Sequence, residues 1–268
     1  MIEKVSTVVV GGGQAGLAMS AHLSDFGMPH VILERQRIAE RWRTERWDSL
    51  VANGPAWHDR FESKVFSDTE PDDFATKAQI IDYFETFAKQ IKAPLRCGVA
   101  VTDVRAQGGS GFRVETSRGV IEAQNVVAAT GPFQRPVIPQ VIPERAGILQ
   151  LHSSAYRNPD QLPDGAVLVV GAGSSGSQIA DELRRSGRDV YLSVGKHDRP
   201  PRRYRGRDFV WWLGALGKWQ EKATQHRVPH RTIAVSGAHG GETVDFRRLA
   251  ARCITLVGRA QRIAGGGV

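Results

Sequence analysis

Short apolar runs that lead into glycine-rich turns organise the start of the chain. Residues 7–10 are Thr-Val-Val-Val, a run typical of a buried strand, and they lead directly into the segment from Gly11 to Gly16. Residues 17–26 then have a helical pattern, which Gly27 ends as a left-handed cap. A second apolar run, Val-Ile-Leu, follows at 31–33. The pattern predicts a strand, a turn, a helix and a second strand.

The same succession recurs in the second half of the chain. Residues 166–170 lead into the segment from Gly171 to Gly176, a helical pattern over 177–186 ends at Gly187, and an apolar run occupies 190–192. The first glycine of the turn and the glycine that ends the helix are 16 positions apart in both copies (27 − 11 and 187 − 171). The matched spacing favours two units of one kind over two unrelated glycine clusters.

Both turns have the pattern Gly-x-Gly-x-x-Gly between a strand and a helix, the context in which this motif binds a dinucleotide. The glycines allow a tight turn, close approach of the backbone to the pyrophosphate, and tight packing of helix on strand. The N-terminus of the helix then offers free N–H groups to the phosphates. The predicted phosphate-binding residues are Gly11, Gly13, Gln14, Ala15 and Gly16 in the first copy and Gly171, Gly173, Ser174, Ser175 and Gly176 in the second.

The two copies differ at the end of their second strand. Glu34 lies 23 positions after Gly11 (34 − 11), where a carboxylate binds the ribose hydroxyls of an adenosine, and Arg35 follows it. The equivalent position of the second copy (171 + 23) is Val194, which cannot repel a 2′-phosphate. A basic run follows, consisting of Lys196, Arg199, Arg202, Arg203, Arg205 and Arg207 against one acid, Asp198. The alternative for this run is a solvated loop.

These differences assign a cofactor to each copy. We expect FAD at the first site, with Glu34 and Arg35 among its ligands. We expect NADPH rather than NADH at the second site, with Lys196 and Arg203 binding the 2′-phosphate.

The segment between the copies completes a first domain. A capping box at residues 76–79 precedes a helix with Ile80, Phe84, Phe87 and Ile91 on one side. Strand-like runs at 99–104, 112–115 and 120–123 predict a small β-meander, and 125–130 predicts a buried strand. The fold class is therefore α/β, with two Rossmann-like dinucleotide-binding domains: an FAD domain at 1–145 and an NADPH domain at 146–268.

An aromatic cluster and a short apolar run occur in the last quarter of the chain. Phe209, Trp211, Trp212 and Trp219 are predicted to pack in a core or between domains, and a substrate channel wall is the alternative. The apolar run at 254–257 is predicted to start a hairpin.

Composition and charge narrow the classes of function. Hydrophobic residues make up 41% and charged residues 24% of the chain, as in a soluble globular protein, and the longest apolar stretches are too short to span a bilayer. The net charge of +8 favours anionic partners. With dinucleotide motifs and no nucleic-acid motif present, those partners are expected to be phosphorylated cofactors. Cys97 and Cys253 are expected to be reduced, buried thiols of a cytoplasmic protein; no metal site is predicted, and a homodimer is left open.

The chain resembles the flavin-containing monooxygenases, a group that includes Baeyer–Villiger-type relatives. The resemblance is carried by the paired glycine motifs with Glu34, by Val-Val-Ala-Ala-Thr-Gly at 126–131, and by His-Ser-Ser-Ala-Tyr at 152–156. The family fingerprint FxGxxxHxxx(Y/W) is matched here at His152 and Tyr156, whereas Ala146 and Ile148 stand at its Phe and Gly positions.

The resemblance implies roles for further residues. Trp42, Thr130 and Gly131 are expected near the FAD, and Asn53 resembles the family asparagine beside the reactive C4a edge of the flavin. An amide there can form a hydrogen bond without giving up a proton. The alternative for Asn53 is a turn residue before Gly-Pro.

The resemblance also implies an activity. In this family NADPH reduces FAD, and the reduced flavin captures dioxygen as a C4a-(hydro)peroxide that oxygenates a nucleophilic nitrogen or sulfur, or a ketone, of a small-molecule substrate. The alternatives are a flavin reductase that passes electrons to another acceptor, or an inactive nucleotide-binding fragment. Family members return to the FAD domain after the NADPH domain, and that return is expected to be missing from this chain, which leaves its FAD domain incomplete.

Overall fold

A computed structural model describes residues 2–109, 111–139, 148–196, 198–222 and 233–261 of the chain. The chain divides into two compact units. The first consists of Met1–Glu45, Phe61–Lys64 and Lys77–Pro136, and the second of Arg46–Arg60, Val65–Thr76 and Val137–Val268. The predicted boundary at 145/146 lies outside the described residues. Residues 46–60 and 65–76, which the sequence analysis assigned to the first domain, cluster with the second unit instead.

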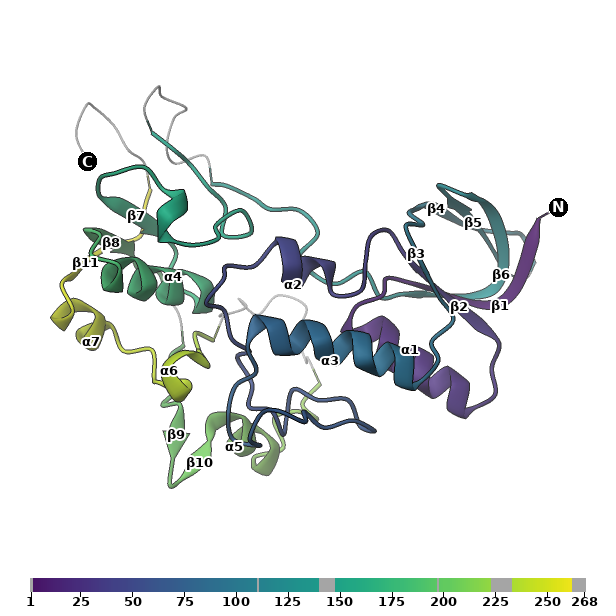
Figure 1. Ribbon diagram of the computed structural model, residues 1–268, viewed down its shortest axis with the longest axis horizontal. Coiled ribbons are helices and arrows are strands. Elements are labelled where there is room, and N and C mark those ends of the chain that lie inside the picture. The colour runs from purple at the N-terminus through teal and green to yellow at the C-terminus, as the bar shows by residue number, and fades with distance from the viewer. Residues whose placement is uncertain (1, 110, 140–147, 197, 223–232, 262–268) are drawn as a thin grey trace. The chain divides into compact units, whose positions relative to one another are not determined.

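The first unit is built on a mixed sheet, which has the strand order β3-β2-β1-β6-β5-β4 in the described part of the chain (Figure 1). Strands β1 (Glu3–Val10), β2 (His30–Glu34), β3 (Leu95–Cys97) and β6 (Gly119–Ala128) are parallel. Strands β4 (Val101–Ala106) and β5 (Phe112–Thr116) continue from β6 in antiparallel pairs. This confirms the predicted meander and the predicted strands on both sides of the first glycine turn.

Apolar side chains of the parallel strands and the meander form one core in this unit. Val8, Val31 and Leu33 of the parallel strands cluster with Val99, Val114, Ile121 and Ala123. Alternating positions of each strand enter this cluster, because successive side chains of a strand point to opposite faces.

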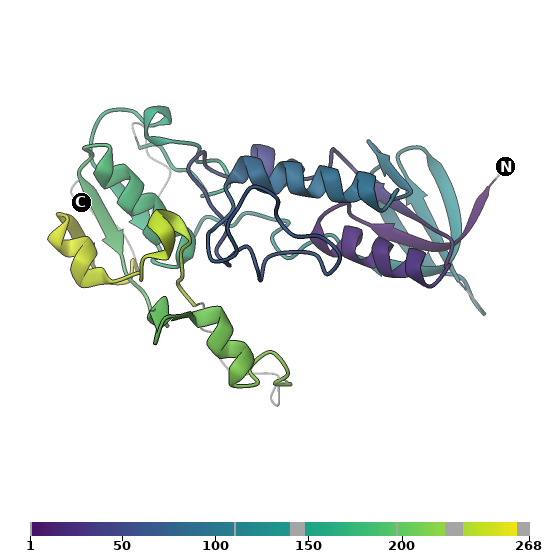
Figure 2. The ribbon, with the colours of Figure 1, turned by 60° about the horizontal axis from the view of Figure 1, so that its bottom comes forward.

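Helices cover the first unit's sheet. Helix α1 (Gln14–Asp25) packs on β1 and β2, and α3 (Lys77–Gln90) runs beside α1 (Figures 1 and 2). The predicted apolar face of α3 is confirmed, with Ile80, Phe84 and Phe87 buried. Tyr83 is buried on the same face; its hydroxyl accepts from the Phe61 amide at 2.8 Å, which holds segment 61–64 on the helix. The short α2 (Glu40–Thr44) completes the unit.

The second unit contains a smaller parallel sheet with the order β11-β8-β7 among its described residues. Strands β7 (Val167–Val170) and β8 (Val190–Ser193) flank α4 (Ser174–Arg185), which packs on the sheet (Figure 2). Strand β11 (Ile254–Val257) pairs in parallel with β8, and the hairpin predicted to start at β11 would continue into residues that lie partly outside the described ranges, so it stays a prediction. Parallel neighbours need a crossover connection rather than a tight turn, and here that connection carries several short elements. They are β9 (Arg203–Tyr204), β10 (Arg207–Asp208), α5 (Phe209–Ala215), α6 (Ala238–Gly241) and α7 (Phe246–Ala251); η1 (Pro159–Gln161) precedes β7.

The third glycine of each motif stands where helix and turn approach most closely. A Cβ on Gly16 would lie 1.9 Å from the carbonyl oxygen of Gly11, and a Cβ on Gly176 would lie 1.8 Å from that of Gly171. The clashing atoms belong to the backbone and cannot rotate away. The two turns therefore share one steric requirement.

We expect Gly16→Ala and Gly176→Ala each to destabilise the fold by about 1–3 kcal/mol, since the new methyl group must displace backbone. Urea unfolding followed by circular dichroism measures this loss. Gly13→Ala is the matched control, because a Cβ there meets no atom within 4 Å. Equal stabilities of Gly16→Ala and Gly13→Ala would contradict the steric argument.

Candidate functional site

The first glycine turn lies against the ends of two strands in the first unit. Gly11 has a φ of 109°, which favours glycine, and its amide donates to the Leu33 carbonyl at 2.8 Å. A Cβ on Gly11 would lie 2.5 Å from the Ala129 carbonyl oxygen. The turn thus lies beside the end of β6, which leads into Thr130 and Gly131, both exposed.

Glu34 faces this turn from the end of β2. Its Oε2 accepts from the Gly12 amide at 2.8 Å, and its Oε1 accepts from the Gln36 amide at 2.9 Å. The structure therefore brings together the first glycine turn, Glu34 and the Thr130–Gly131 pair. Arg35 is exposed next to Glu34.

Trp42 lies half-buried on α2, also in the first unit. The neighbouring Arg41 fixes this helix: its Nε donates to Glu45 at 2.6 Å, and its Nη2 donates to the Phe133 carbonyl. Helix α2 is thereby tied to the segment that follows Gly131.

The second glycine turn repeats the geometry of the first within the second unit. Gly171 has a φ of 100°, and its amide donates to the Ser193 carbonyl at 3.1 Å. Val10 pairs with Leu33 in the first unit, and Val170 pairs with Ser193 in the second. The residues that follow Leu33 and Ser193 therefore occupy equivalent positions, and they are Glu34 and Val194. The Ser174 hydroxyl accepts from the Val235 amide at 3.1 Å, which anchors the start of α4.

The cations of the basic run do not share one environment. Lys196, Arg203 and Arg205 are exposed, the latter two on and beside the β9–β10 hairpin. The Arg199 guanidinium lies 4.0 Å from the centre of the Phe246 ring. Arg202 differs from all of these, because only 1% of it is exposed.

Asn53 is exposed in a loop of the second unit that backbone hydrogen bonds hold. The Ala52 amide donates to the Ala75 carbonyl at 2.7 Å, and the Gly54 amide donates to Oδ2 of Asp59 at 3.0 Å. The side chain of Asn53 is held separately: its Oδ1 accepts from Nε2 of Gln178 at 3.1 Å. Gln178 is one turn after Ser174 on α4, so the helix that opens at the second glycine turn also orients Asn53.

Gln178 was not predicted from the sequence, and Arg202 was predicted only as one of the cations of the basic run. Nη1 of Arg202 donates to the Asn53 carbonyl at 2.7 Å, and its Nε donates to Oδ2 of Asp208 at 2.8 Å. Burial lowers the pKa of the Arg202 guanidinium from its usual value, against the opposing effect of Asp208. The one available signal for Gln178 was its four-residue spacing from Ser174, which places both residues on one helix face.

A buried carboxylate clamps α4 to neighbouring elements. Asp181 accepts from Nε of Arg185 at 2.7 Å and from Nη1 of Arg252 at 2.9 Å, and it lies 3.1 Å from Nε2 of His239. Burial alone would raise the pKa of the Asp181 carboxyl, but the two guanidinium groups outweigh it and hold this pKa below its usual value.

Of the two family fingerprint residues, Tyr156 contacts α4. The Tyr156 hydroxyl donates to Oε2 of Glu182 at 2.7 Å, and burial together with this bond raises the pKa of Tyr156 far above its usual value. His152 forms a local turn, in which its Nδ1 lies 2.9 Å from Oγ of Ser154.

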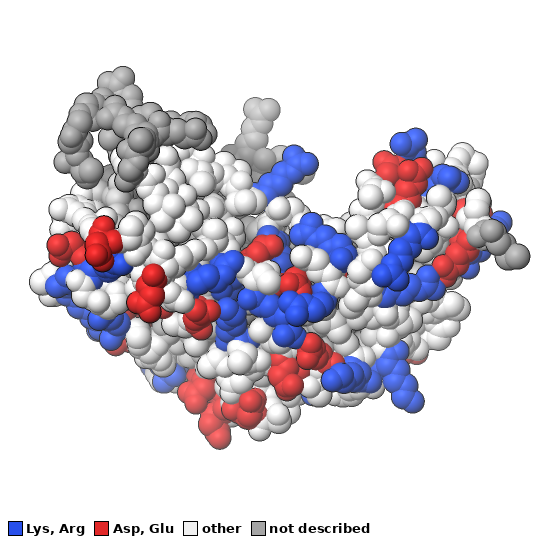
Figure 3. All heavy atoms as spheres, turned by 45° about the horizontal axis from the view of Figure 1, so that its top comes forward, with Lys and Arg blue, Asp and Glu red and all other residues white. Residues whose placement is uncertain are grey.

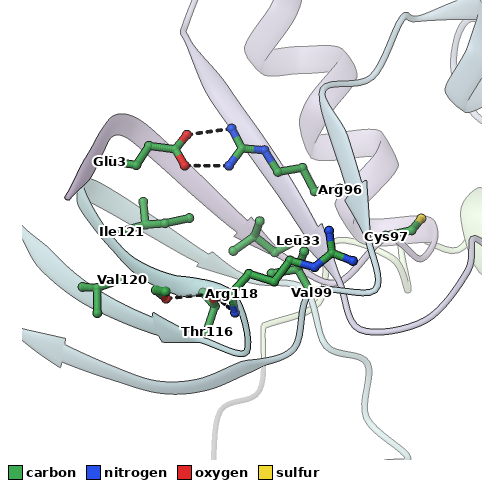
Figure 4. A pocket seen from close by; sticks show the side chains of 10 residues that line it. Glu3, Leu33, Arg96, Cys97, Val99, Thr116, Arg118, Val120 and Ile121 are labelled. Carbon is green, nitrogen blue, oxygen red and sulfur yellow. Dashed lines mark hydrogen bonds and ion pairs between the residues drawn. The ribbon is translucent and has the colours of Figure 1, made fainter. Parts of the chain in front are cut away.

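A pocket in the first unit lies between the parallel strands and the meander (Figure 4). An ion pair of Glu3 with Arg96 lies along it, at 2.6 Å, and Cys97, Thr116 and Arg118 also line it. None of the predicted cofactor-binding residues is among the described residues that line it.

Three further findings concern the residues that the structure describes. Cys97 and Cys253 are exposed free thiols, so the prediction that they are buried is wrong.

None of the described helices is long and apolar enough to cross a bilayer, and no cluster of potential metal ligands occurs in the described ranges. On the face shown in Figure 3, basic and acidic side chains lie intermixed.

Comparison with known proteins identifies the family. Residues 8–214 match the model of the pyridine nucleotide-disulphide oxidoreductases, and the chain belongs to this family. A CzcO-like uncharacterized oxidoreductase of Geobacillus kaustophilus is 39% identical over 216 residues, which cover 80% of this chain and 61% of that protein. A probable indole-3-pyruvate monooxygenase of Arabidopsis thaliana, YUCCA1, is 32% identical over 70% of this chain and 46% of its own length.

The fold is also that of a solved flavoprotein. A flavin-containing monooxygenase from Stenotrophomonas maltophilia matches 98% of this chain and 72% of its own, with a TM-score of 0.74 and 22% identity. The chain is thus an oxidoreductase homologue related to flavin monooxygenases, and it spans about 61% of the length of its CzcO-like relative.

The Asp181 clamp predicts a pH-dependent stability. Because the folded-state pKa of Asp181 is depressed, its stabilisation is present above the unfolded pKa of about 4 and is lost as the pH falls through the folded value. We expect Asp181→Asn to lower the free energy of unfolding by roughly 1–3 kcal/mol at pH 7, and the difference from wild type to shrink below about pH 4. Urea unfolding across this pH range measures it.

Asp189→Asn is the control for this measurement. Asp189 is 85% exposed and lies 3.6 Å from Arg184, so its removal should change stability little at any pH. A loss in Asp181→Asn that is the same at pH 7 and pH 3 would contradict the electrostatic explanation.

Proposed function

We propose that this protein is a flavoprotein monooxygenase that uses NADPH and dioxygen to oxygenate a nucleophilic nitrogen or sulfur, or a ketone, of a small molecule. The observation that carries the proposal is the pair of glycine turns, which share one backbone geometry but present Glu34 in one unit and Val194 in the other. The relationship to flavin monooxygenases supports it.

The first unit fits the adenosine diphosphate part of FAD. Gly13, the cap residue of α1, leaves space for a pyrophosphate because a Cβ there would meet no atom within 4 Å, while Gly11 and Gly16 allow the close packing of the turn on β6 and of the helix on the turn. Glu34 stands beside the turn with a carboxylate that can accept from ribose hydroxyls. We infer that Gln14, Ala15, Arg35, Trp42, Thr130 and Gly131 complete this site.

The second unit fits a dinucleotide with a 2′-phosphate. Gly171, Gly173 and Gly176 repeat the cradle, and Ser174 and Ser175 begin α4. At the ribose position Val194 carries no charge, and the exposed Lys196 follows two residues later. These residues favour NADPH over NADH, with Arg203 as the second cation.

Bound FAD would supply the redox chemistry, accepting a hydride from NADPH and activating dioxygen. The side chains of this chain would bind and orient the cofactors and would stabilise the activated oxygen. Asn53 is the proposed catalytic residue: its exposed amide would donate a hydrogen bond to flavin-activated oxygen, and an amide does not release a proton at neutral pH. A flavin reductase would need no such donor, and an inactive fragment would bind no flavin. If the purified protein is colourless and does not bind added FAD, the enzymatic proposal fails for this chain.

The coenzyme assignment predicts a charge-reversal effect. We expect Lys196→Glu and Arg203→Glu each to weaken NADPH binding by about 10- to 100-fold, the loss of one charge-assisted contact, and NADH binding by much less. Calorimetric titration with both coenzymes measures this without any need for bound flavin. Lys218→Glu, in the same unit, is the control for net charge. Equal weakening of NADPH and NADH would remove the argument for a 2′-phosphate site.

The proposed role of Asn53 predicts that its loss uncouples NADPH oxidation from oxygenation of the substrate. In FAD-loaded protein supplied with NADPH, oxygen and an oxidisable amine or sulfide, we expect Asn53→Ala to keep NADPH oxidation. The ratio of oxygenated product to hydrogen peroxide should fall by about 10- to 100-fold. Asn158→Ala is the matched control, since Asn158 binds Asp48 through its side chain in the same unit. An unchanged ratio in Asn53→Ala would favour the reductase.

A further inference from the structure

Arg202 is a buried cation that the proposed coenzyme site leaves unexplained. Its guanidinium lies 4.5 Å from the centre of the Phe74 ring, and its Nη1 donates both to the Asn53 carbonyl at 2.7 Å and to the Ser236 carbonyl at 3.3 Å. Its Nε binds Asp208. Among the described residues, Nη2 has no hydrogen-bond partner.

Stability alone gives a weak reason for this arrangement. A buried ion pair loses much of its attraction to desolvation, and apolar residues of similar size are often as stabilising. Burial of the unpaired Nη2 adds a further desolvation cost to the folded state. What an apolar side chain could not do is bind the backbone carbonyls of two separate loops at once. The feature that only Arg202 provides is therefore the fixed position of those carbonyls.

The two carbonyls belong to segments that carry residues of the proposed site. One belongs to Asn53, whose side chain Gln178 orients from α4. The other belongs to Ser236, which follows Val235, the residue whose amide binds Ser174 at the second glycine turn. Arg202 thus joins the Asn53 loop to the segment that anchors the start of α4.

We propose that Arg202 is a positioning residue: it holds the backbone of Asn53 so that the Asn53 amide stays in place for the oxygenation reaction. This inference rests on the proposed function for the role of Asn53. The side chain of Arg202 itself is buried and acts through Asn53.

The variant that tests this must not leave a buried charge unpaired. Arg202→Met alone would strand Asp208, so we combine it with Asp208→Asn, whose amide oxygen can still accept from the Val210 amide as Asp208 does. Arg184→Met is the control, because Arg184 also donates to backbone carbonyls, those of Arg252 and Arg188, at the far end of α4.

Amide hydrogen exchange is the first readout and needs no cofactor. The amides of Ala52, Gly54 and Ala56 are hydrogen-bonded in this loop. We expect their exchange to become about 10-fold faster or more in the double variant, whereas β8 stays protected and Arg184→Met resembles wild type. Unchanged exchange over residues 50–56 would overturn the inference.

Coupling of NADPH oxidation to oxygenation is the second readout. In FAD-loaded protein we expect the double variant to lower the ratio of product to hydrogen peroxide as Asn53→Ala does. Adding Asn53→Ala to the double variant should lower the ratio no further, because both changes act on one amide. NADPH affinity should stay within about 3-fold of wild type. Additive losses, or a loss confined to NADPH affinity, would show that Arg202 acts elsewhere and would overturn the inference.

The two proposals can fail separately. If Asn53→Ala leaves coupling unchanged, the proposed function has failed, and the exchange measurement still decides whether Arg202 holds the Asn53 backbone. If coupling depends on Asn53 while exchange at Gly54 is the same in the double variant and wild type, only the inference about Arg202 has failed.

Discussion

The close approach of a helix to its own preceding turn is the constraint on which both proposed nucleotide sites depend. At Gly16 and Gly176 the space for a Cβ is already filled by a carbonyl oxygen, at 1.9 and 1.8 Å. This contact sets the start of each helix at the end of a strand, and the amide of Gly11 or Gly171 then reaches the neighbouring strand. One backbone geometry therefore delivers the next residue of that strand to the same place in both units. In the proposed function, the cofactor at each turn is then selected by one side chain, the carboxylate of Glu34 in the first unit and the uncharged side chain of Val194 in the second.

Features that depend on neighbours in sequence could be predicted. The spacing of glycines identified both turns, since Gly16 and Gly176 each face the carbonyl oxygen of the glycine five positions earlier (16 − 11 and 176 − 171), and the capping box with its apolar face identified α3. Pairings between distant segments could not be predicted in the same way. The parallel pairing of β11 with β8 is an example, because an apolar run is compatible with parallel or antiparallel pairing and the partner strand lies across a connection of some sixty residues. The grouping of residues 46–60 with the second unit has the same origin.

The basic run shows why the site could be predicted only in part. In the sequence, Lys196, Arg202 and Arg203 are equivalent cations of one run, of which Lys196 and Arg203 were predicted to bind the 2′-phosphate. Burial separates them: Lys196 and Arg203 stay in water, where they can meet a phosphate, while Arg202 is enclosed with Asp208 and serves backbone carbonyls. A cation flanked by prolines and other arginines carries no local sign of burial, because the groups that enclose it, Phe74 and Ser236, are distant in sequence.

In the Asn53 loop, the backbone and the side-chain amide are held by different groups. Its path is held by backbone hydrogen bonds and by Arg202, so the loop would keep its shape with many side chains at position 53. The choice of asparagine then calls for a reason in its own amide. Gln178 donates to Oδ1, and an amide whose oxygen is engaged has the two hydrogens of Nδ2 left to offer. Gln178 thereby makes the exposed end of Asn53 a hydrogen-bond donor. The proposed role of Asn53 requires such a donor, one that holds its protons, and the hydrogen bond from Gln178 on α4 supports this role over that of a turn residue before Gly-Pro.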